Sequence, residues 1–80
     1  MVWNWAPVLD PKTALNEWTG GRGLSAPTYA TVAQSGSQHA PTFTVTVTVE
    51  GHGSATGAGS TLRAAQKAAA GAFLSQEGGT

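Results

Sequence analysis

The clearest pattern in the chain is an alternation of apolar and hydroxyl side chains along residues 42–50. One set of alternate positions carries Phe43, Val45, Val47 and Val49, and the other carries Thr42, Thr44, Thr46 and Thr48. Successive side chains of a strand point to opposite faces, so this segment predicts a β-strand with a buried valine face and a solvated threonine face. Two less distinctive segments, 29–34 and 54–59, are predicted to be the other strands.

A second pattern, with the spacing of a helix, follows these strands. Ala65, Ala68, Ala69 and Ala72 fall at positions i, i+3, i+4 and i+7, with Phe73 beside them. This spacing predicts a helix over residues 61–75 whose apolar stripe consists almost entirely of methyl groups. Because these side chains are small, we expect the helix to lie very close to the valine face of the sheet.

A shorter amphipathic segment lies near the start of the chain. Asp10 followed by Pro11 indicates a helix start, because aspartate is a good N-cap and proline needs no donor at the first helical position. The buried side is predicted to contain Ala14, Leu15 and Trp18. A polar patch formed by Thr13, Asn16 and Glu17, at i, i+3 and i+4, is expected to face solvent.

These elements together predict an α+β fold of order α-β-β-β-α. Both helices are expected to cover one face of a three-stranded antiparallel sheet. The chain of 80 residues fits one small domain. We expect residues 1–9 to be an N-terminal tail or linker, residues 10–75 the domain, and residues 76–80 a disordered tail.

The amino-acid composition and the net charge limit the kinds of partner that we expect for this protein. Four basic and four acidic residues give a net charge of zero, whereas nucleic-acid-binding domains typically carry an excess of Lys and Arg. The chain has no cysteine, so no disulfide can stabilise it. No apolar run is long enough to span a membrane and no signal-peptide pattern is present, so we expect a cytoplasmic protein with no membrane partner.

The sequence predicts no catalytic or metal centre. A two-metal nuclease needs carboxylates that converge on a pair of ions. The acidic residues are instead spread over a helix, a strand end and a tail, at Asp10, Glu17, Glu50 and Glu77. The two histidines, His39 and His52, lie in separate turns. We therefore expect no catalytic residues, no metal, no cofactor and no enzymatic activity from this chain alone.

Three blocks of sequence carry a family resemblance: DPKTALNEW, then RGLSAPTYATVAQSGSQHAPTFTVTVTV, then GAGSTLRAAQKAAAGAFL. In their order and spacing, residues 10–74 resemble the double-stranded RNA-binding domain, and within that family the C-terminal domain of bacterial ribonuclease III. The resemblance implies the same α-β-β-β-α fold. It also implies a shape-specific, sequence-independent RNA-binding module that positions duplexes for a nuclease.

The resemblance implies three regions of RNA contact. The first helix presents polar side chains to a minor groove, which here are Thr13, Asn16 and Glu17. The loop between the first two strands enters the next minor groove, and its matching residues are Gly36, Ser37, His39, Ala40 and Pro41. The start of the last helix binds phosphates across the intervening major groove, through Arg63 and Lys67. The wide, shallow minor groove of A-form RNA exposes 2′-hydroxyls, which the polar side chains of the helix and the loop can contact.

The chain departs from the family pattern at the last helix. Leu62 and Gln66 stand where the family places phosphate-binding lysines, and we expect both side chains to be exposed. With two cations in reach, counterion release gives a salt slope of only about −2, so we expect weak binding.

Two functional classes remain open. The first is a module that binds double-stranded RNA within a ribonuclease III-like protein whose catalytic domain lies elsewhere. The second is a protein-interaction or dimerisation module that keeps the fold but has little RNA affinity. The loss of lysine at Leu62 and Gln66 and the exposed apolar Leu62 favour the second class, whereas the retained His39 loop and first-helix patch favour the first. We expect the first class, an RNA-binding module. Besides RNA, a homodimer partner or a nuclease domain in the parent protein is left open.

Overall fold

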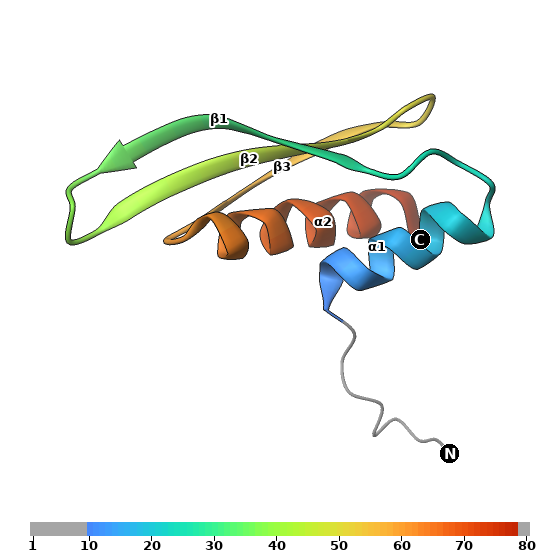
Figure 1. Ribbon diagram of the computed structural model, residues 1–80, viewed down its shortest axis with the longest axis horizontal. Helices are drawn as coiled ribbons and strands as arrows, with labels where there is room; N and C mark the ends of the chain where they lie inside the picture. The colour runs from blue at the N-terminus through green and yellow to red at the C-terminus, as the bar shows by residue number, and fades with distance from the viewer. Residues whose placement is uncertain (1–9, 79–80) are drawn as a thin grey trace, which may run out of the picture.

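Five elements make up the fold, in the order that the sequence predicts. The computed structural model describes residues 10–78, so the predicted N-terminal tail lies outside the described residues. The elements are α1 (Pro11–Gly21), β1 (Thr28–Gly36), β2 (Pro41–Val49), β3 (Gly53–Gly59) and α2 (Leu62–Gly78). Both helices cover the same face of the sheet (Figure 1), which confirms the predicted α+β architecture.

The sheet is antiparallel with β2 at its centre, in the order β1-β2-β3. Of the four residues predicted to be buried, Val45, Val47 and Val49 are buried and Phe43 is half-buried, and the alternate threonines are exposed or half-exposed. The register predicted from the alternation is therefore confirmed. One irregularity lies at Val32, where the pairing of β1 with β2 shifts between Thr31 and Ala33 and leaves the Val32 side chain 58% exposed.

Helix α2 lies very close to β3 because two strand residues lack a side chain. A Cβ atom added at Gly59 would lie 2.7 Å from the Cβ atom of Ala64, and one added at Gly57 would collide with the α2 backbone at Ala69. This contact confirms the expected close approach of an alanine-faced helix. Alanine or any larger residue at these two glycines would push the helix away from the sheet.

The buried stripe of α2 differs in part from the predicted one. Ala65, Ala69 and Phe73 are fully buried as expected, but Ala68 is exposed, Ala72 is half-buried and Ala70 is fully buried. The stripe is rotated because α2 also packs against α1, which a pattern based on the sheet alone does not include. On α1, the predicted buried side is buried in part: Leu15 is fully buried in the same core, and Ala14 and Trp18 are half-buried.

Helix α2 also continues beyond its predicted end at residue 75. The predicted disordered tail is helical as far as Gly78. Two contacts stabilise this last turn: the Gln76 amide donates to the Ser54 carbonyl oxygen at 3.2 Å, and the Glu77 carboxylate lies 3.6 Å from the His52 imidazole. The His52 ring in turn packs edge-on against Trp18, with the ring centroids 5.2 Å apart.

Candidate nucleic-acid interface

The loop between β1 and β2 has a shape fixed by contacts among its own residues. The Ser37 hydroxyl accepts hydrogen bonds from the amides of His39 and Ala40, at 3.2 and 3.1 Å. Gly36 has φ +88°, and a Cβ atom there would collide with the Ala40 carbonyl oxygen, so the turn requires glycine. His39 is exposed in this loop. The loop lies at the far end of the sheet from the β2–β3 turn (Figure 1).

The predicted polar patch on α1 is on the surface. Thr13, Asn16 and Glu17 are all exposed, on a helix whose opposite side buries Leu15 and Thr19. The helix begins as expected, since the Asp10 carboxylate accepts a hydrogen bond from the Lys12 amide at 2.9 Å. The patch therefore offers short donors and acceptors from a rigid helix, which suits contact with the 2′-hydroxyls of a minor groove.

Helix α2 begins with an N-terminus that no acidic residue neutralises. The Thr61 hydroxyl accepts a hydrogen bond from the Ala64 amide at 3.0 Å, and the first turn contains no Asp or Glu. Leu62 is 43% exposed and Arg63 is exposed, as expected. The helix dipole and the exposed guanidinium together favour an anion at this end.

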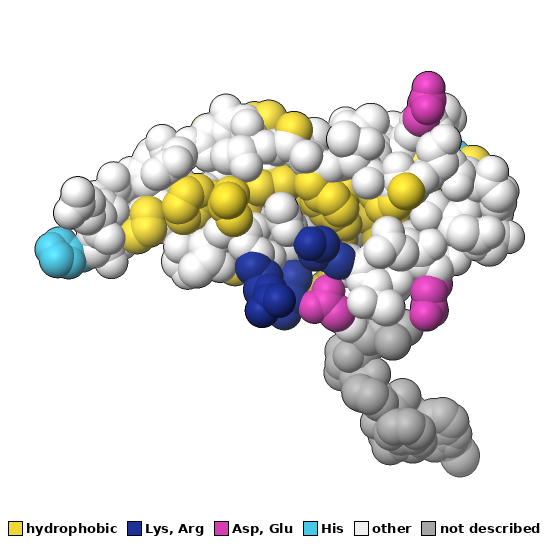
Figure 2. Space-filling view, in the orientation of Figure 1, with side chains coloured by type: hydrophobic (Ala, Val, Ile, Leu, Met, Phe, Trp, Pro, Cys, Tyr) yellow, Lys and Arg dark blue, Asp and Glu magenta, His cyan; other side chains and the backbone are white. Residues whose placement is uncertain are grey.

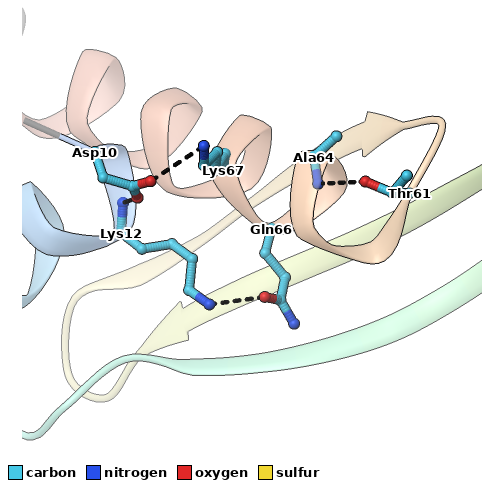
Figure 3. A network of polar contacts seen from close by, with 6 residues as sticks. All are labelled: Asp10, Lys12, Thr61, Ala64, Gln66 and Lys67. Atoms are coloured by element: carbon cyan, nitrogen blue, oxygen red, sulfur yellow. Dashed lines mark hydrogen bonds and ion pairs between the residues drawn. The ribbon is translucent and has the colours of Figure 1, made fainter. Parts of the chain in front are cut away.

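Lys12 and Lys67 join this region through contacts between the two helices (Figure 3). The Lys67 ammonium lies 3.2 Å from the Asp10 carboxylate, and the Lys12 ammonium donates a hydrogen bond to the Gln66 side-chain oxygen at 2.8 Å. Gln66 is half-buried rather than fully exposed, because Lys12 lies against it. Lys12 was missed in the sequence because nothing local to it indicates the approach of α1 to α2.

We call Lys12, Arg63 and Lys67 the cation cluster. Figure 2 shows Lys and Arg side chains gathered on one part of the surface beside an acidic side chain. Arg22, the remaining cation of the chain, lies instead over the Trp18 ring, 4.3 Å from its centroid. Three of the four cations of the chain are thus close to the first turns of α2, although the net charge is zero.

Two ionisable groups beside the cluster have altered pKa values. The backbone amide of Lys12 and the nearby Lys67 ammonium lower the pKa of Asp10 below 3.8. Burial, together with the nearby Asp10 charge, raises the pKa of Tyr29 above 10.0. Asp10 is therefore ionised at neutral pH, and it offsets part of the positive charge of the cluster.

The three regions lie in sequence along the long axis of the molecule (Figure 1). The β1–β2 loop is at one end, α2 begins inward of the loop, and α1 begins farther along. The α2 start thus lies between the two regions that carry the polar, minor-groove type of side chain. This arrangement of polar, cationic and polar surfaces matches the succession of minor, major and minor groove along one side of an A-form duplex.

Residues 10–78 contain no group of three or more His, Cys, Asp or Glu side chains that could hold a metal ion. Within the same range, neither helix has the length and apolar character needed to cross a membrane.

The fold and this surface define a small module for binding double-stranded RNA. The chain matches the double-stranded RNA binding motif over residues 11–77 and belongs to that family. The second such domain of DRB4, in a solution structure, is 38% identical with a TM-score of 0.59, over 86% of this chain and 97% of that one. The family match and the solved structure therefore indicate the same fold for this chain.

The curated relatives include bacterial proteins named ribonuclease 3. The protein from Azorhizobium caulinodans is 50% identical over 72 residues, which are 90% of this chain and 31% of the relative. The protein from Phenylobacterium zucineum is 54% identical over 65 residues, which are 81% of this chain and 27% of the relative. The chain thus spans less than a third of the length of either relative.

Proposed function

We propose that this module binds the surface of duplex RNA through the β1–β2 loop, the α1 patch and the cation cluster together. The loop residues are Gly36, Ser37, His39, Ala40 and Pro41, and the patch residues are Thr13, Asn16 and Glu17. The observation that carries the proposal is the position of the α2 start between two polar regions along one axis (Figure 1). Shape and 2′-hydroxyl contacts then favour A-form RNA over B-form DNA.

The proposed role in a longer protein is to position RNA duplexes for cleavage by a separate ribonuclease III-type catalytic domain in the cytoplasm. Support comes from the ribonuclease 3 relatives, of which this chain covers only a minor part. In this proposal the module holds RNA and contributes no catalytic group. Its own affinity is low because Asp10 offsets the charge of Lys67, and linkage to a second binding or catalytic domain raises the effective affinity.

A titration with matched duplexes tests the proposal. A labelled RNA duplex of about 20 base pairs exceeds the roughly 16 that such a domain spans. We expect the chain to bind this RNA more tightly than DNA of the same sequence, and Arg63→Gln to weaken binding. Equal affinity for RNA and DNA would contradict shape-specific recognition. Absence of RNA binding together with self-association would instead favour an interaction module that uses the exposed Leu62.

A further inference from the structure

Lys12 has a defined position although it is a long side chain near the surface. Its ammonium donates a hydrogen bond to the Gln66 side-chain oxygen at 2.8 Å, and it lies 5.2 Å from the centroid of the Tyr29 ring. Gln66 belongs to the second turn of α2, and Tyr29 belongs to β1. The charge of an α1 residue is therefore delivered to the surface of α2 (Figure 3).

The Lys12 ammonium also has different electrostatic surroundings from the Lys67 ammonium. Lys67 pairs with the Asp10 carboxylate at 3.2 Å, which offsets part of its positive charge. Lys12 contacts a neutral amide and an aromatic ring, and within residues 10–78 no carboxylate lies in ion-pair distance of its ammonium. An ammonium has three donors, so two remain available to a ligand after the bond to Gln66.

We propose that Lys12 is a phosphate-binding residue of this module, positioned by Gln66 and Tyr29. The proposal rests on the function proposed above and assigns α1 a second role besides its polar patch. Lys12 supplies a cation to the α2 surface at the point where α2 itself has the neutral Gln66. Because two contacts already restrict the Lys12 side chain, less conformational freedom is lost when it meets a phosphate.

Exchange of the two side chains tests this assignment. In Lys12→Gln the ammonium is removed, and in Lys12→Gln/Gln66→Lys the ammonium is moved to the other end of the same hydrogen bond. If Lys12 meets one phosphate, Lys12→Gln should lower the slope of log affinity against log salt by about 0.9 and weaken RNA binding about eightfold at 0.1 M salt. The exchanged pair should restore both the affinity and the slope.

Arg22→Gln is the matched control, because it removes the same unit of charge from the opposite end of α1, where Arg22 lies over Trp18. The probe throughout is a labelled RNA duplex of about 20 base pairs, which is longer than the domain span. Melting temperatures measured in parallel identify any variant that acts through folding, since loss of a structural contact would not change the salt slope of the folded protein.

The outcomes separate this inference from the proposed function. If Arg63→Gln weakens RNA binding but Lys12→Gln leaves affinity and slope unchanged, Lys12 is not a phosphate ligand, and the proposed function stands. If Arg22→Gln lowers the slope as much as Lys12→Gln, the effect is one of net charge, and the inference is overturned. If the unaltered chain binds no duplex RNA, both proposals fail.

Discussion

The carboxylate of Asp10 makes two contacts at the junction of the helices. It lies 3.2 Å from the Lys67 ammonium and accepts a hydrogen bond from the Lys12 amide at 2.9 Å. One residue thus begins α1 and restrains a cation of the proposed RNA surface. The local stability of α1 and the charge available to RNA are therefore linked through a single side chain.

Asp10→Asn should separate these two effects. Asparagine can keep the cap hydrogen bond, so α1 should still begin at the same residue, and the variant should lose only the part of the free energy of unfolding that depends on the negative charge of Asp10. Lys67 loses its ion partner and becomes available to phosphate, so RNA affinity should rise. The salt slope should steepen by about 0.9 if the released ammonium meets one phosphate. An affinity and slope equal to those of the unaltered chain would show that Asp10 does not restrain Lys67.

The lowered pKa of Asp10 predicts a specific pH dependence of stability. The folded state holds the carboxylate ionised to lower pH than the unfolded chain, whose value is near 3.8. The unfolded state therefore binds more protons in this range, and stability rises with pH. The contribution is present above about pH 3.8 and is lost as the pH falls through the lower, folded value.

Urea unfolding of the unaltered chain and of Asp10→Asn, from neutral pH to below pH 3.8, measures this contribution. The other carboxylates titrate in both proteins, so the difference between the two curves isolates Asp10. We expect the stability of the unaltered chain to fall more steeply on acidification. Parallel curves would contradict the assigned role of Asp10 in the folded state.

Ala69→Leu should destabilise the fold by overpacking. Ala69 is fully buried, and its backbone nitrogen lies where Gly57 allows closest approach of helix and strand. The added isopropyl group should cost about 1–3 kcal/mol of unfolding free energy, measured by thermal or urea unfolding. Ala58→Leu, the same change at an exposed position of β3, is the control and should leave stability nearly unchanged.

The two histidines should respond in opposite ways to alanine substitution. His39 is exposed in the β1–β2 loop, so His39→Ala should weaken RNA binding with little effect on the melting temperature. His52 contacts Trp18 and Glu77 near the helix C-termini, so His52→Ala should lower the melting temperature and leave RNA affinity of the folded protein unchanged. Unchanged binding in His39→Ala would remove the loop from the proposed interface, and reduced binding in folded His52→Ala would contradict a purely structural role for His52.

Leu62→Lys should strengthen RNA binding at a small cost in stability. Leu62 is 43% exposed in the first turn of α2, so a lysine there needs no repacking. The new cation lies at the positive end of the helix dipole, so the free energy of unfolding should fall by roughly a few tenths of a kcal/mol. The salt slope should steepen by about 0.9 if the lysine meets a phosphate. An unchanged slope would indicate that this surface does not face RNA.

Local patterns in the sequence predicted much of the fold. The alternation of residues 42–50 assigned Val45 and Val47 to the core, and the Asp10–Pro11 pair located the start of α1, because both signals act between near neighbours. The α1 patch and the β1–β2 loop depended on the family resemblance, and their exposure fits that assignment. Their contact with RNA stays a prediction.

The features that the sequence did not predict depend on distant parts of the chain. Lys12 and Gln66 are separated by 54 positions, and only the packing of α1 on α2 brings them together. The same packing rotates the buried stripe of α2 from Ala68 towards Ala70. Likewise, Gln76 and Glu77 are ordered by contacts with residues of the β2–β3 hairpin, so composition alone suggested a tail there.

The irregular pairing at Val32 has a consequence for how molecules of this chain behave together. Strand β1 is an edge strand of the sheet, and none of its residues, TYATVAQSG, has a charged side chain. An uncharged edge strand exposes unpaired backbone N–H and C=O groups, with which a strand from another molecule can pair. The bulge at Val32 bends the strand and interrupts its regular spacing of donors and acceptors. This backbone geometry should hinder the addition of a strand from another molecule, a role that charged side chains such as Lys play on the edges of many other sheets.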